Sequence, residues 1–387
     1  MNLLVASHLY PSSLSRTAGS FVHNQARFLA ALAGVRVVSP TPWFPPLPGF
    51  GRWSAYPTLP RREVLDGVEL ERPSYLTIPR RMFFSRVWRF YLGALVRSQE
   101  GRPPPDLIHA HCAYPDGLAA VEYGRLLGRP VVITVHGHDL KDLPRDPRWR
   151  PLVARALQQA QAVVAVSQEL GGLARELGAR GLRVIPNGVD CELFRPGSRR
   201  PGEGGWRLLY VGRFDAAKGL GVLLEALALL RQRRGDISLK LVGGSSATGT
   251  EAPFREQVAR LGLGDCVEFA AEVPWAEVPR QMGEADVLVL PSFSEGLPLV
   301  LVEALACGLP LVATRCGGPE ELVRPGLGQL VGVREVEGLA RGIEAVLDHY
   351  ADYDRQAIRR RAEEEYDYRR IAARLLAVYE EVLRAPR

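Results

Sequence analysis

The chain has 387 residues, of which 47% are apolar and 24% are charged, a balance typical of globular proteins that excludes a disordered or fibrous one. No stretch approaches the roughly 20 uncharged apolar residues of a membrane span, and no basic region precedes the apolar start MNLLVA, so we expect neither a transmembrane helix nor a signal peptide. The five cysteines are scattered without a C-x-x-C pair, which indicates a reduced, cytoplasmic protein without a structural zinc site.

The formal net charge of +6 is unevenly distributed along the chain. Residues 1–105 hold 13 arginines, no lysine and five acidic residues, a balance of +8, whereas residues 191–387 carry a balance of −3. Only three lysines are present, so Lys218 stands out among basic residues that are nearly all arginine. The first half of the protein is therefore predicted to be its basic side.

In the first half, short β-branched runs alternate with longer segments of helical periodicity, such as 117–127 and 148–160. The predicted strands are Asn2–Ser7, Val35–Ser39, Asp106–His111, Val131–His136, Ala162–Ser167 and Leu182–Pro186. Nearly continuous apolar strands separated by helices predict a parallel sheet that is covered on both faces.

Two segments interrupt this alternation. Residues 42–60 are rich in proline and aromatic residues and are predicted to form an ordered loop. Residues 80–97 place Phe84, Trp88, Tyr91 and Leu95 at helical spacing among five arginines, which predicts a basic amphipathic helix. This helix either packs on its own sheet with its arginines outward or rests, together with the aromatic loop, on an anionic membrane surface or an acidic lipid-linked acceptor.

The Pro- and Gly-rich segment 189–205 is expected to be a linker, after which the alternation restarts. The predicted strands here are Arg207–Gly212, Leu239–Val242, Val267–Ala270, Ala285–Pro291, Leu311–Thr314 and Gln329–Val331, with helices at 220–234 and 300–307 and a charged helical tail. The sequence thus predicts an α/β fold with domains at 1–188 and 206–365 and a C-terminal helix at 366–387.

Functional residues in α/β sheets gather beyond the carboxyl ends of the strands. Arg213 and Lys218 follow one such strand, where two cations could neutralise a diphosphate, Arg through its fork and Lys as a point charge. Pairing of these cations with Asp215 is the alternative interpretation. After a later strand, Glu295 precedes a helix and Glu303 lies within it, a spacing suited to the hydroxyl groups of a sugar and a ribose.

The segments VGRFDAAKG and SEGLPLVLVEALACGLPLVATRCGGPEEL resemble the donor-binding signatures of retaining glycosyltransferases of family 4, and Glu295 and Glu303 match the E-x7-E motif of that family. LRVIPNGVD, DLIHAHCAYPDG and VVITVHGHD resemble further family segments, so the likeness covers most of residues 106–321. The resemblance implies the GT-B fold, in which two Rossmann-like domains face a deep interdomain cleft and the C-terminal helix crosses back to the first domain.

The resemblance also implies roles for individual residues. Arg213 and Lys218 would bind the donor phosphates and stabilise the leaving nucleotide, Glu295 would contact the transferred sugar, and Glu303 the ribose. His136 would lie near the sugar and the attacking hydroxyl. The remaining donor-binding residues would be Gly19, Asn187, Gly188, Val273, Gly296, Leu299 and Val300, with Val273 meeting the base and the last two offering backbone N–H groups to the phosphates.

The implied activity is a retaining, metal-independent hexosyl transfer from a nucleotide-diphosphate sugar to a glycan, glycolipid or small-molecule hydroxyl, in cell-envelope or polysaccharide biosynthesis. The donor is a substrate of the UDP or GDP type, and no cofactor and no metal are expected. We expect a cytoplasmic enzyme that binds no nucleic acid and that is peripheral on the inner membrane face if the basic aromatic segment docks there. Two loops depart from the family pattern. The first loop reads Thr17-Ala18-Gly19-Ser20 and lacks the family's Gly-Gly pair. After strand Leu239–Val242, the family usually has a G-x-G turn that is accompanied by an acidic residue, whereas this chain has the loop GGSSATGTEAP.

Other functions remain as alternatives. A nucleotide-sugar epimerase or hydrolase could use the same fold and donor, and a binding module could retain the donor site without catalysis. A metal-dependent hydrolase could use His109, His111, His136, His138 and Asp139, because H-x-H places both rings on one face of a strand. An NAD-dependent dehydrogenase is excluded, since no G-x-G-x-x-G follows the first strand.

Overall fold

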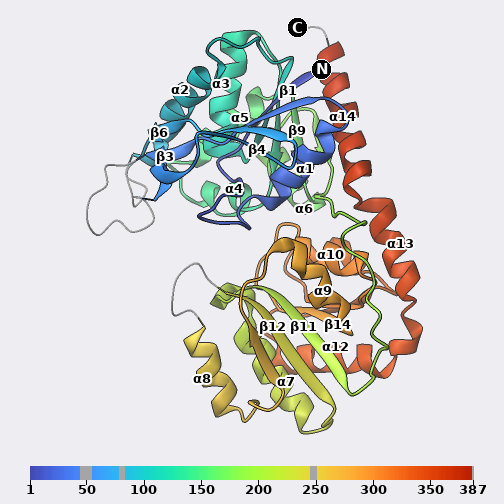
Figure 1. Ribbon diagram of the computed structural model, residues 1–387. Coiled ribbons are helices and arrows are strands. Elements are labelled where there is room, and N and C mark those ends of the chain that lie inside the picture. Colours follow the sequence, from blue (N-terminus) through green and yellow to red (C-terminus); the bar gives the residue numbers. More distant parts are fainter. Residues whose placement is uncertain (44–54, 78–82, 245–250, 386–387) are drawn as a thin grey trace. The chain divides into compact units, whose positions relative to one another are not determined.

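The computed structural model describes residues 1–43, 55–77, 83–244 and 251–385. The chain forms two compact units (Figure 1). Unit 1 comprises residues 1–187 together with 368–387, and unit 2 comprises residues 188–367. The polypeptide therefore leaves unit 1 after Asn187 and returns to it at Tyr368.

Unit 1 is built on an eight-stranded sheet of order β10-β9-β8-β7-β1-β2-β5-β4. Its strands are β1 (Asn2–Ala6), β2 (Gly34–Val38), β4 (Arg62–Leu65), β5 (Val68–Glu71), β7 (Leu107–His111), β8 (Val131–Val135), β9 (Ala162–Ala165) and β10 (Leu182–Val184). All neighbours pair in parallel except β4, which runs antiparallel to β5 at one edge. A two-stranded parallel sheet of β3 (Thr41–Trp43) and β6 (Ser74–Leu76) lies outside it.

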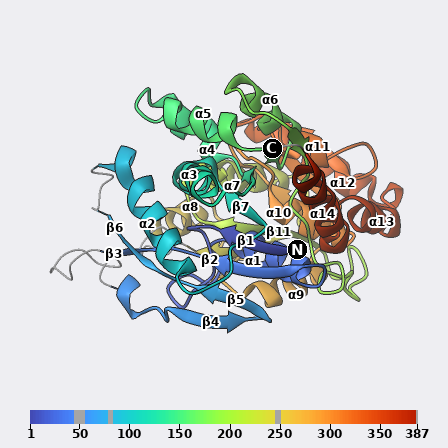
Figure 2. The same cartoon turned by 90° about the horizontal axis from the view of Figure 1, so that it is seen from above.

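Helices cover the sheet of unit 1, as Figure 2 shows from above. They are α1 (Ser20–Ala30), α2 (Val87–Gln99), α3 (Leu118–Leu127), α4 (His138–Lys141), α5 (Arg150–Gln159), α6 (Gln168–Glu176) and α14 (Tyr368–Arg384). Helix α3 packs against both α2 and α5. The central strands β7, β8 and β9 are buried along their whole length, as expected of parallel strands between helical layers.

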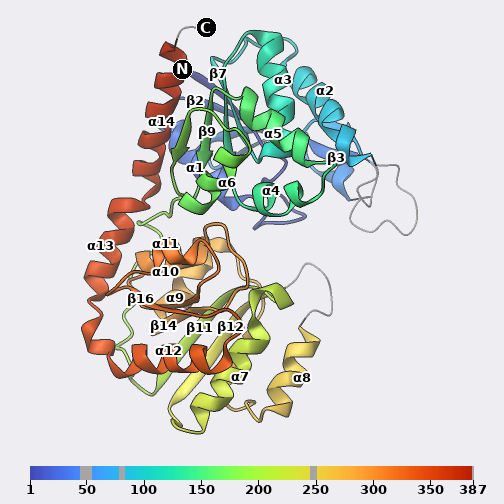
Figure 3. The same ribbon diagram turned by 180° about the vertical axis from the view of Figure 1, so that it is seen from behind.

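The C-terminal helix α14 is part of unit 1 and lies beside α1 (Figures 1 and 3). Its buried residues recur on one face, at Ile371, Ala372, Leu375, Val378 and Tyr379. All five join the same hydrophobic cluster as Leu3, Val22 and Leu29 of β1 and α1. The helix thus completes the core of unit 1, in agreement with the return of the C-terminus that the resemblance implies.

Unit 2 contains a six-stranded, wholly parallel sheet of order β13-β12-β11-β14-β15-β16. The strands are β11 (Trp206–Arg213), β12 (Ile237–Gly244), β13 (Val267–Ala270), β14 (Val287–Leu290), β15 (Leu311–Thr314) and β16 (Gly328–Val331). The helices are α7 (Leu220–Arg231), α8 (Ala252–Arg260), α9 (Val278–Gly283), α10 (Leu299–Ala306), α11 (Pro319–Leu322), α12 (Val336–Asp348) and α13 (Arg355–Glu365).

Each strand predicted for the parallel sheets is present, which confirms the α/β fold class. The hairpin β4–β5 and the small strands β3 and β6 were not predicted, because each of these strands has only three or four residues and lacks a continuous apolar run. Residues 189–205, expected as a linker, belong to unit 2, where Phe194 is fully buried.

The two unusual segments are only partly described. The expected loop 42–60 begins within β3 and includes a short 3-10 turn at Tyr56–Thr58, while residues 44–54 lie outside the described residues. In the expected helix 80–97, a 3-10 turn at Phe84–Arg86 leads into α2, and residues 80–82 lie outside the description. Among the described residues, none of the helices combines the length and apolar character that crossing a bilayer requires.

Candidate active site

In unit 2, two of the predicted donor-site residues form an ion pair. The Nζ atom of Lys218 lies 2.7 Å from Oε1 of Glu295, and their side chains are 22% and 12% exposed. Lys218 ends the 3-10 turn Ala216–Lys218 that follows β11, and Glu295 lies in the loop that follows β14. Because β11 and β14 are neighbours in the sheet, both residues lie beyond the carboxyl ends of adjacent strands.

Backbone contacts fix these two loops against each other. The N–H of Phe293 donates to the carbonyl of Ala217 over 2.9 Å. Gly219 has φ 70°, and a Cβ atom there would lie 1.9 Å from the carbonyl oxygen of Pro291. Only glycine combines this left-handed conformation with so close an approach, so Gly219 sets the position of Lys218.

Arg213 ends β11 and is 74% exposed at its side chain. Its guanidinium lies 3.2 Å from Asp215, which also accepts the backbone N–H of Lys218. This is the alternative pairing considered from the sequence. Since an exposed ion pair contributes at most about 1 kcal/mol, the guanidinium can exchange Asp215 for a stronger anion at little cost.

Glu303 lies within α10 and accepts a hydrogen bond from the indole Nε1–H of Trp275 over 2.8 Å. Burial raises the pKa of Glu303 to about 7, and the bond from Trp275 opposes this shift. Trp275 also packs its ring against Phe194, with ring centroids 5.3 Å apart. Trp275 was not predicted from the sequence, where an indole two residues after Val273 carries no recognisable signal.

The other predicted residues of unit 2 lie in the segments that follow β13 and β14. Leu299 and Val300 are the first residues of α10, whose initial backbone N–H groups have no partner within the helix. Gly296 lies one residue after Glu295, and its carbonyl oxygen approaches Gly318 so closely that a Cβ atom on Gly318 would lie 2.1 Å from it. Val273 is half-buried between β13 and the turn that contains Trp275.

In unit 1, His136 follows β8 and belongs to a group of hydrogen-bonded histidines. Its Nε2 atom lies 2.9 Å from Nδ1 of His111, and the two rings are stacked with centroids 5.2 Å apart. The ring of His109 packs on His111 and bonds to Thr134 at 2.7 Å and to the hydroxyl of Tyr379 at 2.8 Å. The network therefore connects His136 to helix α14.

Burial keeps these imidazoles neutral at physiological pH. It lowers the pKa of His109 and of His136 to about 3, and that of His111 well below its usual value. The Nδ1 atom of His136 is buried and has no hydrogen-bond partner within the described part of the chain. The backbone N–H groups of His136 and Gly137 both donate to Asp139, so that carboxylate shapes the turn that presents His136.

Of the remaining predicted residues, Gly19 and Asn187 belong to unit 1. Gly19 caps α1 with φ 69°, and a Cβ atom there would lie 2.3 Å from the carbonyl group of Leu9. The loop after β1 thus passes directly against this glycine, although the family's Gly-Gly pair is missing. Asn187 is buried at the end of the first segment of unit 1, and Gly188 is the first residue of unit 2.

Sequence reasoning missed a second polar cluster at this edge of unit 1. His8 follows β1, and its Nδ1 atom lies 2.5 Å from Oδ2 of Asp116, which is fully buried. The other oxygen of Asp116 accepts the backbone N–H of His8 at 2.5 Å and the hydroxyl of Tyr91 at 2.6 Å. A histidine just beyond the first strand and an Asp-Gly turn after a later strand are the signals that could have indicated it.

The histidines considered as metal ligands are occupied by other contacts. His138 is 61% exposed and bonds to Asp142, whereas His111 and His136 bond to each other and His109 bonds to Thr134 and Tyr379. Within residues 1–43, 55–77, 83–244 and 251–385, no group of three or more His, Cys, Asp or Glu residues is arranged to hold a metal ion.

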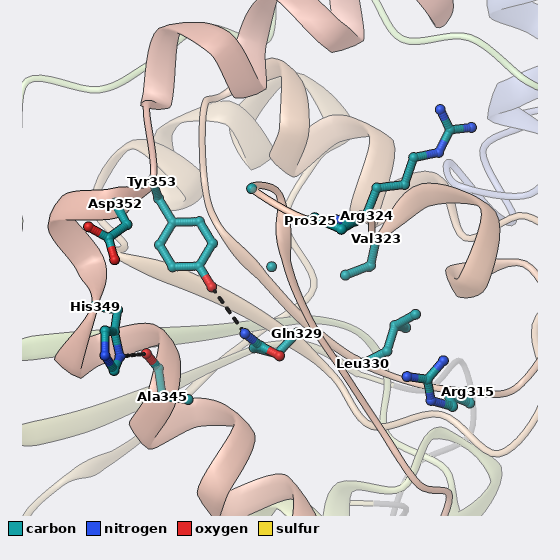
Figure 4. A pocket seen from close by; sticks show the side chains of 12 residues that line it. Arg315, Val323, Arg324, Pro325, Gln329, Leu330, Ala345, His349, Asp352 and Tyr353 are labelled. Carbon is teal, nitrogen blue, oxygen red and sulfur yellow. Dashed lines mark hydrogen bonds between the residues drawn. The ribbon is translucent and has the colours of Figure 1, made fainter.

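A separate pocket of about 600 Å³ lies in unit 2 beside the edge strand β16 (Figure 4). The amide of Gln329 and the hydroxyl of Tyr353 point toward each other across it at 3.5 Å, and His349 bonds to the carbonyl of Ala345. None of the predicted site residues lines this pocket.

Two protein families together match nearly the whole chain. Residues 18–193 match the family described as Glycosyltransferase Family 4, and residues 196–365 match Glycosyl transferases group 1. A glycosyltransferase of Bacillus subtilis assigned to teichuronic acid biosynthesis, TuaC, is 30% identical over 358 residues, which cover 89% of this chain and 88% of TuaC.

Solved structures show the same architecture. Sucrose-phosphate synthase from Thermosynechococcus elongatus superposes with a TM-score of 0.78 at 23% identity, covering 100% of both chains. HepE from Anabaena, solved in complex with UDP, has a TM-score of 0.75 at 21% identity and covers 98% of this chain and 100% of that one. The chain is therefore an enzyme that transfers glycosyl units, and it belongs to the family 4 glycosyltransferases of the two-domain GT-B fold.

Proposed function

We propose that the protein is a retaining, metal-independent hexosyltransferase that uses a nucleotide-diphosphate sugar of the UDP or GDP type. Its acceptor is a hydroxyl of a glycan, glycolipid or small molecule in cell-envelope or polysaccharide biosynthesis. The observation that carries the proposal is the pairing of Lys218 with Glu295 beyond the carboxyl ends of β11 and β14. The UDP complex of HepE and the biosynthetic assignment of TuaC support the choice of donor and pathway class.

The donor diphosphate would replace Glu295 as the partner of Lys218 and Asp215 as the partner of Arg213. The first N–H groups of α10, at Leu299 and Val300, would bind the same phosphates. These groups supply the positive charge that many enzymes obtain from a metal ion. Glu303 would accept hydrogen bonds from the ribose hydroxyls, and Val273 would meet the base through main-chain atoms.

In the transfer step, the acceptor oxygen forms a bond to the anomeric carbon on the face from which the diphosphate leaves. The bond between that carbon and the phosphate oxygen breaks, and the departing phosphate oxygen takes the acceptor proton. Attack and departure on one face retain the anomeric configuration. Lys218 and Arg213 stabilise the charge on the leaving diphosphate, while Glu295 and His136 orient the transferred sugar.

A donor screen tests this function. We expect one nucleotide-diphosphate sugar to raise the melting temperature by mass action, and transfer to continue in excess EDTA with retention of the anomeric configuration. Lys218→Ala provides the matched control, because it should lose both stabilisation by the donor and transfer. An inverted product, or a complete loss of transfer in EDTA that added metal restores, would contradict the proposal.

We further propose that unit 1 rests on an anionic membrane surface. In α2 and the turn before it, Tyr91 and Leu95 are buried, whereas Phe83 and Phe90 are 60% and 44% exposed and lie among the exposed Arg86 and Arg89. Strand β6, which packs against α2, pairs its exposed Leu76 with the exposed Trp43 of β3. Exposed aromatic side chains beside arginines are typical of interfacial membrane binding.

Sedimentation with vesicles tests this second proposal. The protein should bind vesicles of phosphatidylcholine and phosphatidylglycerol at low salt, and the double variant Arg86→Glu and Arg89→Glu should bind much less. Charge reversal of Arg341 and Arg384, two exposed arginines on α12 and α14, is the control. Equal binding of both double variants, or no binding by the unmodified protein, would refute membrane docking through α2.

A further inference from the structure

Unit 1 contains an Asp–His pair that the proposed donor chemistry does not use. Asp116 is fully buried, and its two oxygens accept three hydrogen bonds, two of them from His8 and one from Tyr91. The imidazole of His8, in contrast, is 32% exposed. A buried carboxylate that anchors a partly exposed imidazole through both its ring and its backbone holds that ring in one orientation.

The hydrogen bonds also determine which ring nitrogen of His8 carries the proton. A carboxylate oxygen only accepts hydrogen bonds, so Nδ1 must donate to Asp116. In neutral His8 the other nitrogen, Nε2, therefore has a free lone pair and points away from Asp116. Among the described residues, the His8 ring forms a hydrogen bond through Nδ1 alone.

The position of His8 places this lone pair among the acceptor-side residues. His8 follows β1, Asp116 follows β7 and His136 follows β8, and these three strands are consecutive in the sheet. The charge of Asp139 raises the pKa of His8, and the charge of His8 contributes to the lowered pKa of His136. His8 therefore lies beyond the carboxyl ends of the strands that also carry His136.

We propose that His8 binds a hydroxyl group of the sugar acceptor, with Nε2 accepting the hydrogen bond and with Asp116 and Tyr91 as positioning residues. This inference rests on the proposed glycosyl transfer and adds to it a residue for acceptor recognition. The ligand class is a neutral hydroxyl, because a nitrogen lone pair attracts an O–H group and repels an anion. No proton is transferred to His8 in this role.

Two other histidines of unit 1 show what distinguishes His8. His23 has both nitrogens occupied, Nδ1 by the hydroxyl of Tyr10 and Nε2 by Asp66, each at 2.8 Å, so its ring can bind nothing further. His138 bonds to Asp142 through Nδ1, but its partner is half exposed rather than buried. His138 therefore serves as a control that has the same chemistry without the rigid support.

Acceptor binding should weaken as the solution becomes acidic. Burial lowers the pKa of His8, but the charge and hydrogen bond of Asp116 and the charge of Asp139 together raise it above its ordinary value of 6.5. The groups that face His8 are Asp116 from the turn after β7, Tyr91 from α2, and His136 and Asp139 from the segment after β8. Protonation of Nε2 removes the lone pair, so acceptor affinity should increase with pH through this pKa.

Nuclear magnetic resonance of ring-¹⁵N histidine tests the geometry without any activity. At pH 8 we expect His8, assigned through His8→Asn, to show a protonated Nδ1 and an unprotonated Nε2. Titration with methyl glycosides of glucose, galactose and mannose should shift the Nε2 signal of His8, and the signals of His138 should not move. A proton on Nε2 at pH 8, or an Nε2 signal that none of the glycosides moves, overturns the proposal.

Kinetics with the same glycosides as acceptors separate binding from structural effects. His8→Asn keeps the contact with Asp116 but lacks Nε2, so the KM for the acceptor should rise at least tenfold while donor affinity is unchanged. His8→Gln places a carboxamide oxygen near the position of Nε2 and should recover part of this loss. His138→Asn should leave both constants unchanged.

Other outcomes are equally informative. An unaltered acceptor KM in His8→Asn, or a loss that falls on donor affinity instead, rejects the assignment of His8 to the acceptor. Tighter binding of glycosides at pH 5 than at pH 8 rejects the lone-pair mechanism. If no nucleotide sugar stabilises the unmodified protein, the proposed function fails, while the resonance titration still decides whether His8 binds sugar hydroxyls.

Discussion

Lys218 and Glu295 stand 77 positions apart in the chain, yet their charged atoms meet at 2.7 Å. In the protein without donor, the carboxylate of Glu295 pairs with the Lys218 ammonium group that is proposed to bind the donor phosphates. In the proposed mechanism, the donor diphosphate would replace Glu295 as the partner of Lys218, and Glu295 would contact the transferred sugar. The two residues would thus couple phosphate binding to the orientation of the sugar.

Replacing the carboxylate should separate binding from catalysis. In Glu295→Gln, Lys218 loses its counter-charge, so UDP or GDP without sugar should bind about fivefold more tightly, as the loss of a roughly 1 kcal/mol competing ion pair predicts. Transfer should nevertheless fall by orders of magnitude, as it should in Glu295→Ala. Isothermal titration calorimetry measures nucleotide binding and a transfer assay measures activity. The control Lys218→Ala should weaken both nucleotide binding and transfer. Unchanged transfer in Glu295→Gln would remove Glu295 from the mechanism.

Glu303 should make nucleotide affinity depend on pH. Burial raises its pKa from 4.5 to about 7 in the folded protein without ligand, so the carboxyl group is largely protonated at pH 6 and ionised at pH 8. Ribose hydroxyls donate more strongly to the ionised form, and nucleotide affinity should therefore rise from pH 6 to pH 8. Titration calorimetry of Glu303→Gln, which cannot ionise, should show a flat profile; a persistent rise would assign the dependence to another group.

The same group should affect stability in the opposite direction. The folded protein holds the proton of Glu303 at a higher pH than the unfolded chain, so stability is lost as pH rises from about 4.5 to 7. Glu303→Gln should therefore raise the melting temperature relative to the unmodified protein at pH 8 but not at pH 4. Thermal unfolding at the two pH values measures this difference, and an equal shift at both would contradict it.

Trp275 should act through Glu303. Trp275→Phe keeps an aromatic ring against Phe194 but removes the indole N–H that lowers the pKa of Glu303. The pH profile of nucleotide affinity should consequently shift to higher pH, with affinity restored near pH 9. A uniform loss of affinity at every pH would instead indicate that the indole contacts the nucleotide directly.

The hydroxyl of Tyr379 should stabilise the packing of α14 against the sheet of unit 1. Its buried hydroxyl bonds to Nδ1 of His109, so Tyr379→Phe leaves a buried imidazole nitrogen without a partner and should cost about 1–3 kcal/mol of unfolding free energy. Tyr123→Phe is a matched control, because the Tyr123 hydroxyl is buried without any partner among the described residues and its removal should be neutral or slightly stabilising. Urea unfolding compares the two, and equal costs would deny Tyr379 this role.

Gly219 should be indispensable to the position of Lys218. Gly219→Ala would place Cβ 1.9 Å from the carbonyl oxygen of Pro291 and must displace the loop, so donor affinity should fall at least tenfold. Gly128→Ala has a similar φ of 64° but meets no atom within 4 Å, so it should lower stability by about 1 kcal/mol and leave donor affinity intact. Titration calorimetry measures donor affinity in both variants. A loss in Gly219→Ala alone would indicate displacement of the loop, whereas an equal loss in both would indicate a general effect of placing alanine at positive φ.

Much of this protein follows from local patterns in the sequence. The buried parallel strands and the two-domain α/β organisation were predictable, because a strand covered on both faces must be continuously apolar and the helices between strands are amphipathic. Arg213, Lys218, Glu295 and Glu303 could be selected because they lie at or after the end of a strand or within the following helix in a recognisable motif. Strands β3, β4, β5 and β6 could not be predicted, since segments of three or four residues are too short to show such a pattern.

Tertiary structure alone decided which residues meet. The pairing of Lys218 with Glu295, the bond from Trp275 to Glu303 and the anchoring of His8 by Asp116 each join residues that no local pattern connects. For Lys218 with Glu295 and for His8 with Asp116, the order of strands in the sheet brings the two residues together, because the ends of neighbouring parallel strands share one edge whatever their separation along the chain. The basic first half likewise proved to hold buried, neutral histidines, since burial and not composition sets the protonation of an imidazole.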